Sequence, residues 1–127
     1  MNFIDCVYNN TFLKTIFPKG VTDLVFMAHI GLNPESEFSL NIHTKQKPSR
    51  EVPKWGVWGV NYDTVVITML GTGIDHIQIS DWNKIGYSIL RCESLNGKFR
   101  LETVGEDWAV AFTFKTLTFQ QCRTYRS

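Results

Sequence analysis

The sequence predicts an α+β fold with one dominant, curled antiparallel β-sheet of about seven or eight strands and one short N-terminal helix. Apolar and polar residues alternate with a period of two from Asp63 to the C-terminus, as in strands with one buried face. Nine Phe, four Trp and four Tyr accompany many Val, Ile and Thr residues, which favour a pleated surface. Short turn sequences separate the strands, so neighbours are expected to pair antiparallel.

The helix is predicted near the N-terminus. Asn9 or Asn10, followed by Thr11, can cap its first turn. The apolar residues that follow lie on one helical stripe: Phe12, Leu13, Ile16 and Phe17. Pro18 and Gly20 then end the helix after about two turns.

Two strands are predicted next, Val21 to Ile30 and Phe38 to Thr44. Asn33-Pro34 supplies the turn chemistry between them. The second strand alternates apolar and polar side chains, which indicates one solvated face. Residues 45–54, KQKPSREVPK, hold two prolines and four basic residues and form the long loop of the chain.

The strand from Asp63 to Leu70 has apolar residues on both faces and is expected to be central and buried on both. Gly71 to Gly73 is predicted to be a tight turn that pairs this strand with the next one, which contains Ile77 and Ile79, as a hairpin. Asp81-Trp82-Asn83 ends that strand. The remaining strands are expected at 87–93, 99–104, 108–115 and 117–124, which together form a meander.

Length and composition predict one domain, 1–127, that folds without disulfides or metals. The start of the chain lacks the pattern of a signal peptide, and no apolar run is long enough to cross a membrane. The three cysteines are single and odd in number, as in the reducing cytoplasm. A Cys92–Cys122 disulfide is the less favoured alternative, because the context of a small secreted protein is missing.

The titratable residues form no catalytic or metal-binding signature, so we expect no enzyme, no cofactor and no metal. The three histidines, His29, His43 and His76, lie one per strand without a second ligand at metal-binding spacing. A nucleophilic pair of Cys92 and His76 is conceivable. Cys92 is in phase with neighbouring apolar positions, however, and a small buried hydrophobic residue is the simpler interpretation.

Basic side chains cluster in the long loop beside Trp55 and Trp58, a mixture found in binders of single-stranded nucleic acid. The formal net charge is only +1, so no nucleic-acid partner is expected. The two tryptophans are three residues apart, which is not the strand period. Either both close the open end of the curled sheet, or one stays partly exposed and anchors a partner.

The segment around these tryptophans resembles the Imm50-like immunity proteins of bacterial polymorphic toxin and contact-dependent growth inhibition systems. The residues that carry the resemblance are Pro53-Lys54-Trp55, Asn61-Tyr62-Asp63, the strand Thr64 to Leu70, and Gly73 to Trp82. The early helix that ends at Phe17-Pro18 and the Gly86-Tyr87 strand also fit the pattern.

The resemblance implies a small cytoplasmic protein that binds and neutralises the C-terminal domain of a cognate toxin, without catalytic residues of its own. We expect carboxylates around one hairpin, together with a Trp-containing turn and the exposed tryptophan, to face the toxin: Asp81, Trp82, Glu102, Glu106, Asp107 and Trp58. The alternative function is a small barrel-like carrier of an apolar molecule, lined by Phe26, Phe38, Phe99, Phe112 and Phe114.

Overall fold

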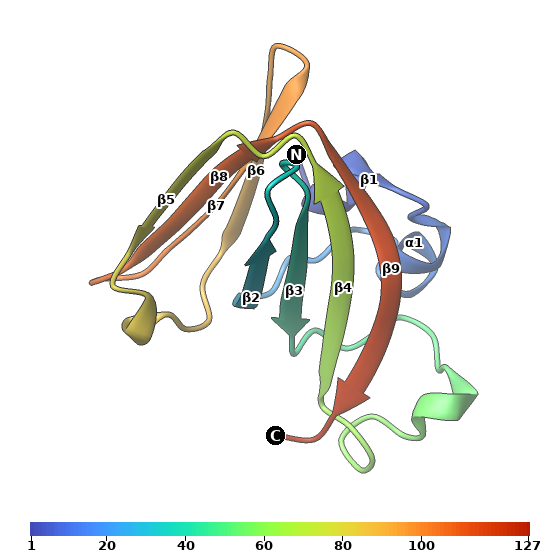
Figure 1. The fold of residues 1–127 in the computed structure, drawn as a ribbon. Helices are drawn as coiled ribbons and strands as arrows, with labels where there is room; N and C mark the ends of the chain where they lie inside the picture. The colour runs from blue at the N-terminus through green and yellow to red at the C-terminus, as the bar shows by residue number, and fades with distance from the viewer.

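The computed structural model describes residues 1–127 and places nine strands in two sheets, with little helix (Figure 1). The α+β class with a dominant antiparallel sheet is therefore confirmed. The elements in chain order are η1 (Phe3–Cys6), β1 (Val7–Tyr8), α1 (Thr11–Ile16), β2 (Val25–Leu32), β3 (Phe38–Thr44), η2 (Pro53–Trp55), β4 (Thr64–Thr72), β5 (His76–Ser80), η3 (Trp82–Lys84), β6 (Leu90–Leu95), β7 (Lys98–Val104), β8 (Ala109–Phe114) and β9 (Thr116–Tyr125). None of the helices has the length and apolar character that crossing a membrane requires.

The larger sheet has five strands in the order β1-β9-β4-β3-β2, all antiparallel except for the parallel pair β1 and β9. The first half of β4 is buried on both faces, as expected of a central strand, since Val65, Val66 and Ile67 are all fully buried. The second half differs, because Leu70 is 46% exposed. The two-residue strand β1 was not predicted from the sequence.

The smaller sheet has four antiparallel strands in the order β5-β8-β7-β6. The predicted hairpin between the strands ending at Leu70 and starting at His76 is wrong, because β5 pairs with β8 instead of β4. The predicted turn at 71–73 is also wrong in part, since Gly71 and Thr72 continue β4. The chain bends at Gly73, whose φ of 70° suits glycine, and then enters the second sheet.

The chain returns to the larger sheet beside the same bend. β8 ends at Phe114 and β9 begins at Thr116, opposite Thr72. The Lys115 amide donates to the Thr72 carbonyl at 2.9 Å. The segments β4–β5 and β8–β9 thus form one antiparallel ribbon that is folded over and shared by both sheets, and this fold is the ridge in Figure 1.

The core lies between the inner faces of the two sheets and is covered at its side by α1 and η1. Phe38 of β3 joins the sheets, with its ring centroid 5.6 Å from those of both Phe112 and Phe114 of β8. A second link lies at the far edge, where Val25 and Ser88 exchange backbone hydrogen bonds of 2.8 and 2.9 Å. The two sheets therefore curl around one core without closing into a barrel.

Candidate functional site

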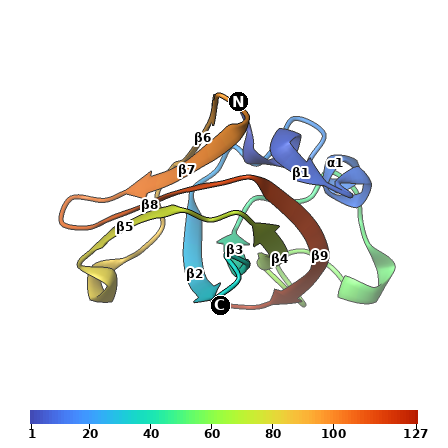
Figure 2. The same ribbon diagram turned by 45° about the horizontal axis from the view of Figure 1, so that its top comes forward.

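Four of the six residues expected to contact a partner lie together at one end of the four-stranded sheet. The strand register shows this at Ala109 of β8, which is opposite Ser80 of β5 on one side and Val104 of β7 on the other. The residues that follow Ser80 and those that connect β7 to β8 therefore project beyond the same sheet end (Figure 2). We call Asp81, Trp82, Glu106 and Asp107 the acidic end.

Trp82 supplies an exposed aromatic surface at this end. It is the first residue of η3 and is 38% exposed, and Ile79, three residues earlier on β5, is 44% exposed. Asp81 before it has a left-handed backbone with φ of 53°, and its carbonyl accepts the amide of Lys84 at 2.8 Å. This tight turn places Trp82 beyond the end of the strand, and the Asp81 side chain is exposed.

The other two carboxylates lie on a turn held by a buried tryptophan. Gly105 donates its amide to the carbonyl of Trp108 at 3.0 Å, and Trp108 is only 9% exposed. The Trp108 indole occupies the space where a Cβ of residue 105 would lie, so a larger residue there would displace the indole. Glu106 and Asp107 are exposed between these two residues.

The carboxylates of the acidic end are not neutralised within the chain. Its ion pairs join Lys98 to Asp75 and Arg100 to Glu93 and Glu102. Asp81, Glu106 and Asp107 take part in none of them, and Lys84 is the one basic side chain on η3. The acidic end therefore combines the exposed Trp82 side chain with three carboxylates that form no ion pair.

Glu102 lies apart from the acidic end, in the middle of β7. Its register partners are Arg91 on β6 and Ala111 on β8, and its carboxylate is 2.9 Å from Arg100. Glu102 and Arg100 border a shallow hollow of about 510 Å³ that forms over Ala109 and Ala111, where the side chains are small. Glu102 thus faces solvent from the outer face of the sheet.

Trp58 lies in another part of the molecule, in the loop between η2 and β4. Its ring packs edge-to-face on Tyr62, with 5.3 Å between centroids, and it is partly exposed. Trp55 is buried and packs on Phe12 of α1 and on Tyr62, at 5.7 and 5.8 Å. One tryptophan of the pair is therefore structural, and the other offers part of its surface to solvent.

The outer edge of β5 is a feature that sequence reasoning missed. β5 is the terminal strand of its sheet, with an unbulged register and the uncharged sequence Ile77-Gln78-Ile79-Ser80. Such an edge presents unpaired backbone N–H and C=O groups. β2, one of the two edge strands of the larger sheet, is bulged after Met27 and bridged by Ser88. The predicted hairpin gave β5 the wrong partner, β4 in place of β8. No local feature of the sequence indicates that the other edge of β5 is free.

The alternative nucleophilic pair is not formed. His76 lies on β5 and Cys92 on β6, at opposite edges of the four-stranded sheet with two strands between them. At about 4.8 Å per strand, the two backbones are roughly 14 Å apart. His43 instead bonds through Nδ1 to the hydroxyl of Tyr125 at 2.8 Å. No three His, Cys, Asp or Glu side chains converge as metal ligands.

Comparison of the chain with protein-family models, with curated proteins and with solved structures gives no match.

Proposed function

We propose that this chain is a bacterial immunity protein that binds the C-terminal domain of a cognate toxin in the cytoplasm and blocks it without catalysis. The observation that carries the proposal is the acidic end, where exposed Trp82 and the unpaired carboxylates of Asp81, Glu106 and Asp107 lie at the same end of the sheet. The sequence resemblance to Imm50-like immunity proteins supports the same function.

The acidic end has the composition of a binding hot spot. Tryptophan is enriched at such positions because it buries a large area with little loss of side-chain entropy. Charged groups around an apolar centre accelerate encounter and select partners of opposite charge. Trp82 supplies the exposed aromatic side chain here, and the three carboxylates lie at the same end of the sheet. The partner surface is therefore expected to be basic and to offer a pocket for an indole.

The remaining contact area would come from the neighbouring edge of β5 and the outer face of the four-stranded sheet. A specific interface needs about 800 Å² on each partner, more than four side chains supply. Both neighbouring surfaces adjoin the acidic end (Figure 2); most residues of β5 are exposed, and the outer face of the sheet is partly exposed. Binding there would leave the five-stranded sheet and the loop that carries Trp58 free.

The test is copurification with, and affinity for, the polypeptide encoded by the adjacent reading frame. Trp82→Ala is expected to weaken binding at least tenfold, because a buried anchor is worth about 2 kcal/mol or more. Asp81→Asn, Glu106→Gln and Asp107→Asn together are expected to slow association, most strongly at low salt.

A matched control removes three carboxylates elsewhere. Asp23, Glu35 and Glu37 are exposed and free of ion pairs, so Asp23→Asn, Glu35→Gln and Glu37→Gln change the net charge equally. Equal loss of affinity in both triple variants would remove the acidic end from the interface. Failure of the wild-type protein to bind the adjacent product, or to protect cells that express it, would remove the immunity function itself.

The carrier alternative gains no specific observation. Phe38, Phe99, Phe112 and Phe114 pack on one another with centroids 5.6 to 5.9 Å apart, so their rings fill the space that a ligand would need. Phe26 belongs to a different cluster, with His43 and Tyr87. These contacts support core packing as the role of Phe38, Phe99, Phe112 and Phe114, whereas Phe26 packs outside the core.

A further inference from the structure

Two of the three cysteines meet inside the fold although 86 positions separate them in the chain. Cys6 is the last residue of η1, and Cys92 lies in the middle of β6. Their Sγ atoms are 3.8 Å apart, and both side chains are buried. Cys122 lies on β9, opposite Ile67, and makes no such contact.

The contacts of the two thiols assign them different roles. The Cys6 Sγ–H donates to the carbonyl of Phe3 at 3.1 Å, and the Cys92 Sγ–H points to Cys6. The contact with Cys92 and burial raise the pKa of the Cys6 thiol, whereas the contact with Cys6 and the positive charge of the Met1 amino group lower the pKa of the Cys92 thiol. Cys92 therefore ionises first, and a thiolate is the form that attacks a disulfide.

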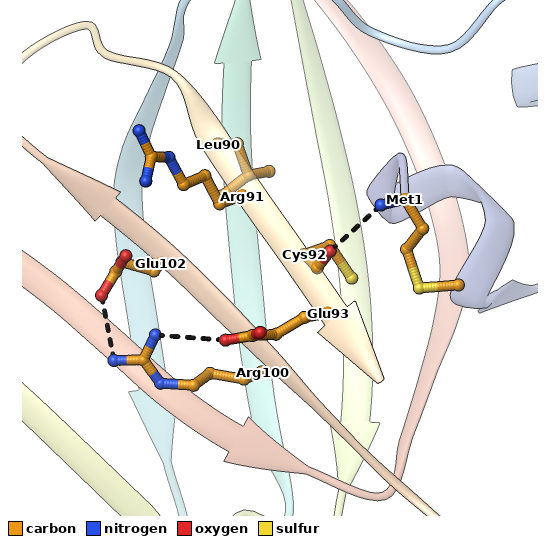
Figure 3. Close-up of a pocket in the computed structure, with 7 residues that line it drawn as sticks. All are labelled: Met1, Leu90, Arg91, Cys92, Glu93, Arg100 and Glu102. Atoms are coloured by element: carbon orange, nitrogen blue, oxygen red, sulfur yellow. Dashed lines mark hydrogen bonds and ion pairs between the residues drawn. The ribbon is translucent and has the colours of Figure 1, made fainter. Parts of the chain in front are cut away.

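Cys92 lies between the buried core and a hollow on the surface. The residue lines a surface hollow of about 420 Å³, together with Met1 beside it, Leu90 and Arg91 of β6 and Arg100 of β7 (Figure 3). Met1 bonds through its amino group to the Cys92 carbonyl at 3.4 Å and is 60% exposed. The Cys92 side chain itself is 6% exposed, so a reagent that reaches its Sγ atom displaces the side chains around it.

We propose that Cys6 and Cys92 are a redox-modification site that closes to a disulfide when the chain meets an oxidised low-molecular-weight disulfide, such as glutathione disulfide. The Cys92 thiolate attacks one sulfur of the reagent, forms a mixed disulfide and expels one thiolate. The Cys6 thiol then loses its proton, attacks the Cys92 sulfur and expels the second thiolate. Two protein thiols and one small disulfide thus give one protein disulfide and two small thiols.

The closure needs only a small movement and has a defined structural effect. The sulfurs approach from 3.8 Å to the S–S bond length of about 2.05 Å, a shift that side-chain rotation can supply. The bond joins η1, which leads into β1 of the larger sheet, to β6 of the smaller sheet. It therefore ties the N-terminal segment to the far wall of the core and restricts the unfolded chain over a long loop.

The test equilibrates the reduced full chain with buffers of rising glutathione disulfide content, followed by acid quenching, alkylation and mass spectrometry. We expect the loss of two hydrogens, a Cys6–Cys92 cross-link in the peptide map, and alkylation of Cys122 alone. The melting temperature should rise by about 5–10 °C on closure and return after reduction.

Two variants separate the roles of the thiols. Cys6→Ser removes the resolving thiol, so one glutathionyl group should remain on Cys92. Cys122→Ser should close as the wild type does. Two results in the folded wild type would overturn the proposal. One is that all thiols stay alkylatable at every ratio of glutathione disulfide to glutathione, and the other is a cross-link that includes Cys122. Both readouts use the wild-type chain, so they stand even where a variant folds poorly.

Discussion

At the scale of single residues, the contact of Gly105 with Trp108 fixes the turn that carries two carboxylates of the acidic end. The indole of Trp108 fills the position that a Cβ at residue 105 would take. This explains why Trp108 is buried while Glu106 and Asp107, beside it in the chain, are exposed. The apolar contact positions the charged side chains.

Gly105→Ala is therefore expected to lower the free energy of unfolding by about 1–3 kcal/mol, because the buried indole must move. Urea denaturation measures this change. Gly86→Ala is the matched control, since a Cβ at residue 86 meets nothing within 4 Å. Equal stability of the two variants would show that the turn tolerates a displaced Trp108.

His43 gives the fold a pH dependence. Burial lowers the pKa of its imidazole, and the positive charge of Arg123 adds to the shift. The unfolded chain, with an ordinary histidine pKa of about 6.5, then binds the proton more readily than the folded chain does. The free energy of unfolding should therefore fall as the pH drops from 7.5 to below the unfolded-state pKa of about 6.5.

Urea denaturation at pH 7.5 and pH 5.5 checks this prediction. His43→Asn should reduce the loss of stability between the two values, because the residue no longer titrates. His76→Asn, at an exposed position on β5, serves as the control and should retain the wild-type loss. A loss that is the same in the wild type and in His43→Asn would assign the pH dependence to other groups.

At the scale of elements, the bend at Gly73 decides the topology, because it carries one strand of the ribbon from β4 in one sheet to β5 in the other. Gly73 has a left-handed backbone, and a Cβ there would meet the inner part of the Lys115 side chain. Lys115 is the residue at which the partner strand changes sheets. The bend is thus tight on both strands.

Gly73→Ala should cost more stability than Gly97→Ala, by about 1 kcal/mol. Both glycines have positive φ, 70° and 85°, so the backbone strain is comparable. A Cβ at residue 97 meets nothing within 4 Å, whereas one at residue 73 displaces Lys115. Thermal unfolding of the two variants measures the difference, and the reverse order of stability would contradict a bend held by Lys115.

Strand bounds could be predicted from the sequence, but the change of sheet at this bend could not. Alternation gave β3 its observed bounds, Phe38–Thr44, because a strand with one buried face imprints a period of two. Pairing is not encoded locally, so a glycine after β4 suggested a hairpin where the structure has a change of sheet. The observed pairing of β5 with β8 leaves the other edge of β5 free, and the sequence did not predict this edge.

The candidate site shows the same limit. Exposed acids and a tryptophan could be selected from residue type, and four of the six selected residues do lie together. Asp81 and Asp107 come together because β5 pairs with β8, which the sequence does not reveal. Glu102 and Trp58 lie elsewhere because strand position and loop packing place them. The contact of Cys6 with Cys92 likewise depends on a long-range approach of η1 and β6.

At the scale of the whole molecule, the two sheets share one core and one ribbon, so they should fold and unfold together. Phe38 is the side chain that joins them, since it is 2% exposed and touches Phe112 and Phe114 across the core. Its ring also covers Gly71 on the neighbouring strand. Its loss therefore affects both sheets at once.

Phe38→Ala is expected to lower the free energy of unfolding by about 3–5 kcal/mol, because it removes a buried ring and leaves a cavity between the sheets. Hydrogen exchange should accelerate for the amides of β7 and β8 as well as for those of β3 and β4, because one cooperative unit opens. Leu32→Ala is the control, at a position on β2 that is 57% exposed, and should change neither sheet. Acceleration confined to β3 and β4 would mean that the four-stranded sheet is stable without the larger one, and that the acidic end does not depend on the shared core.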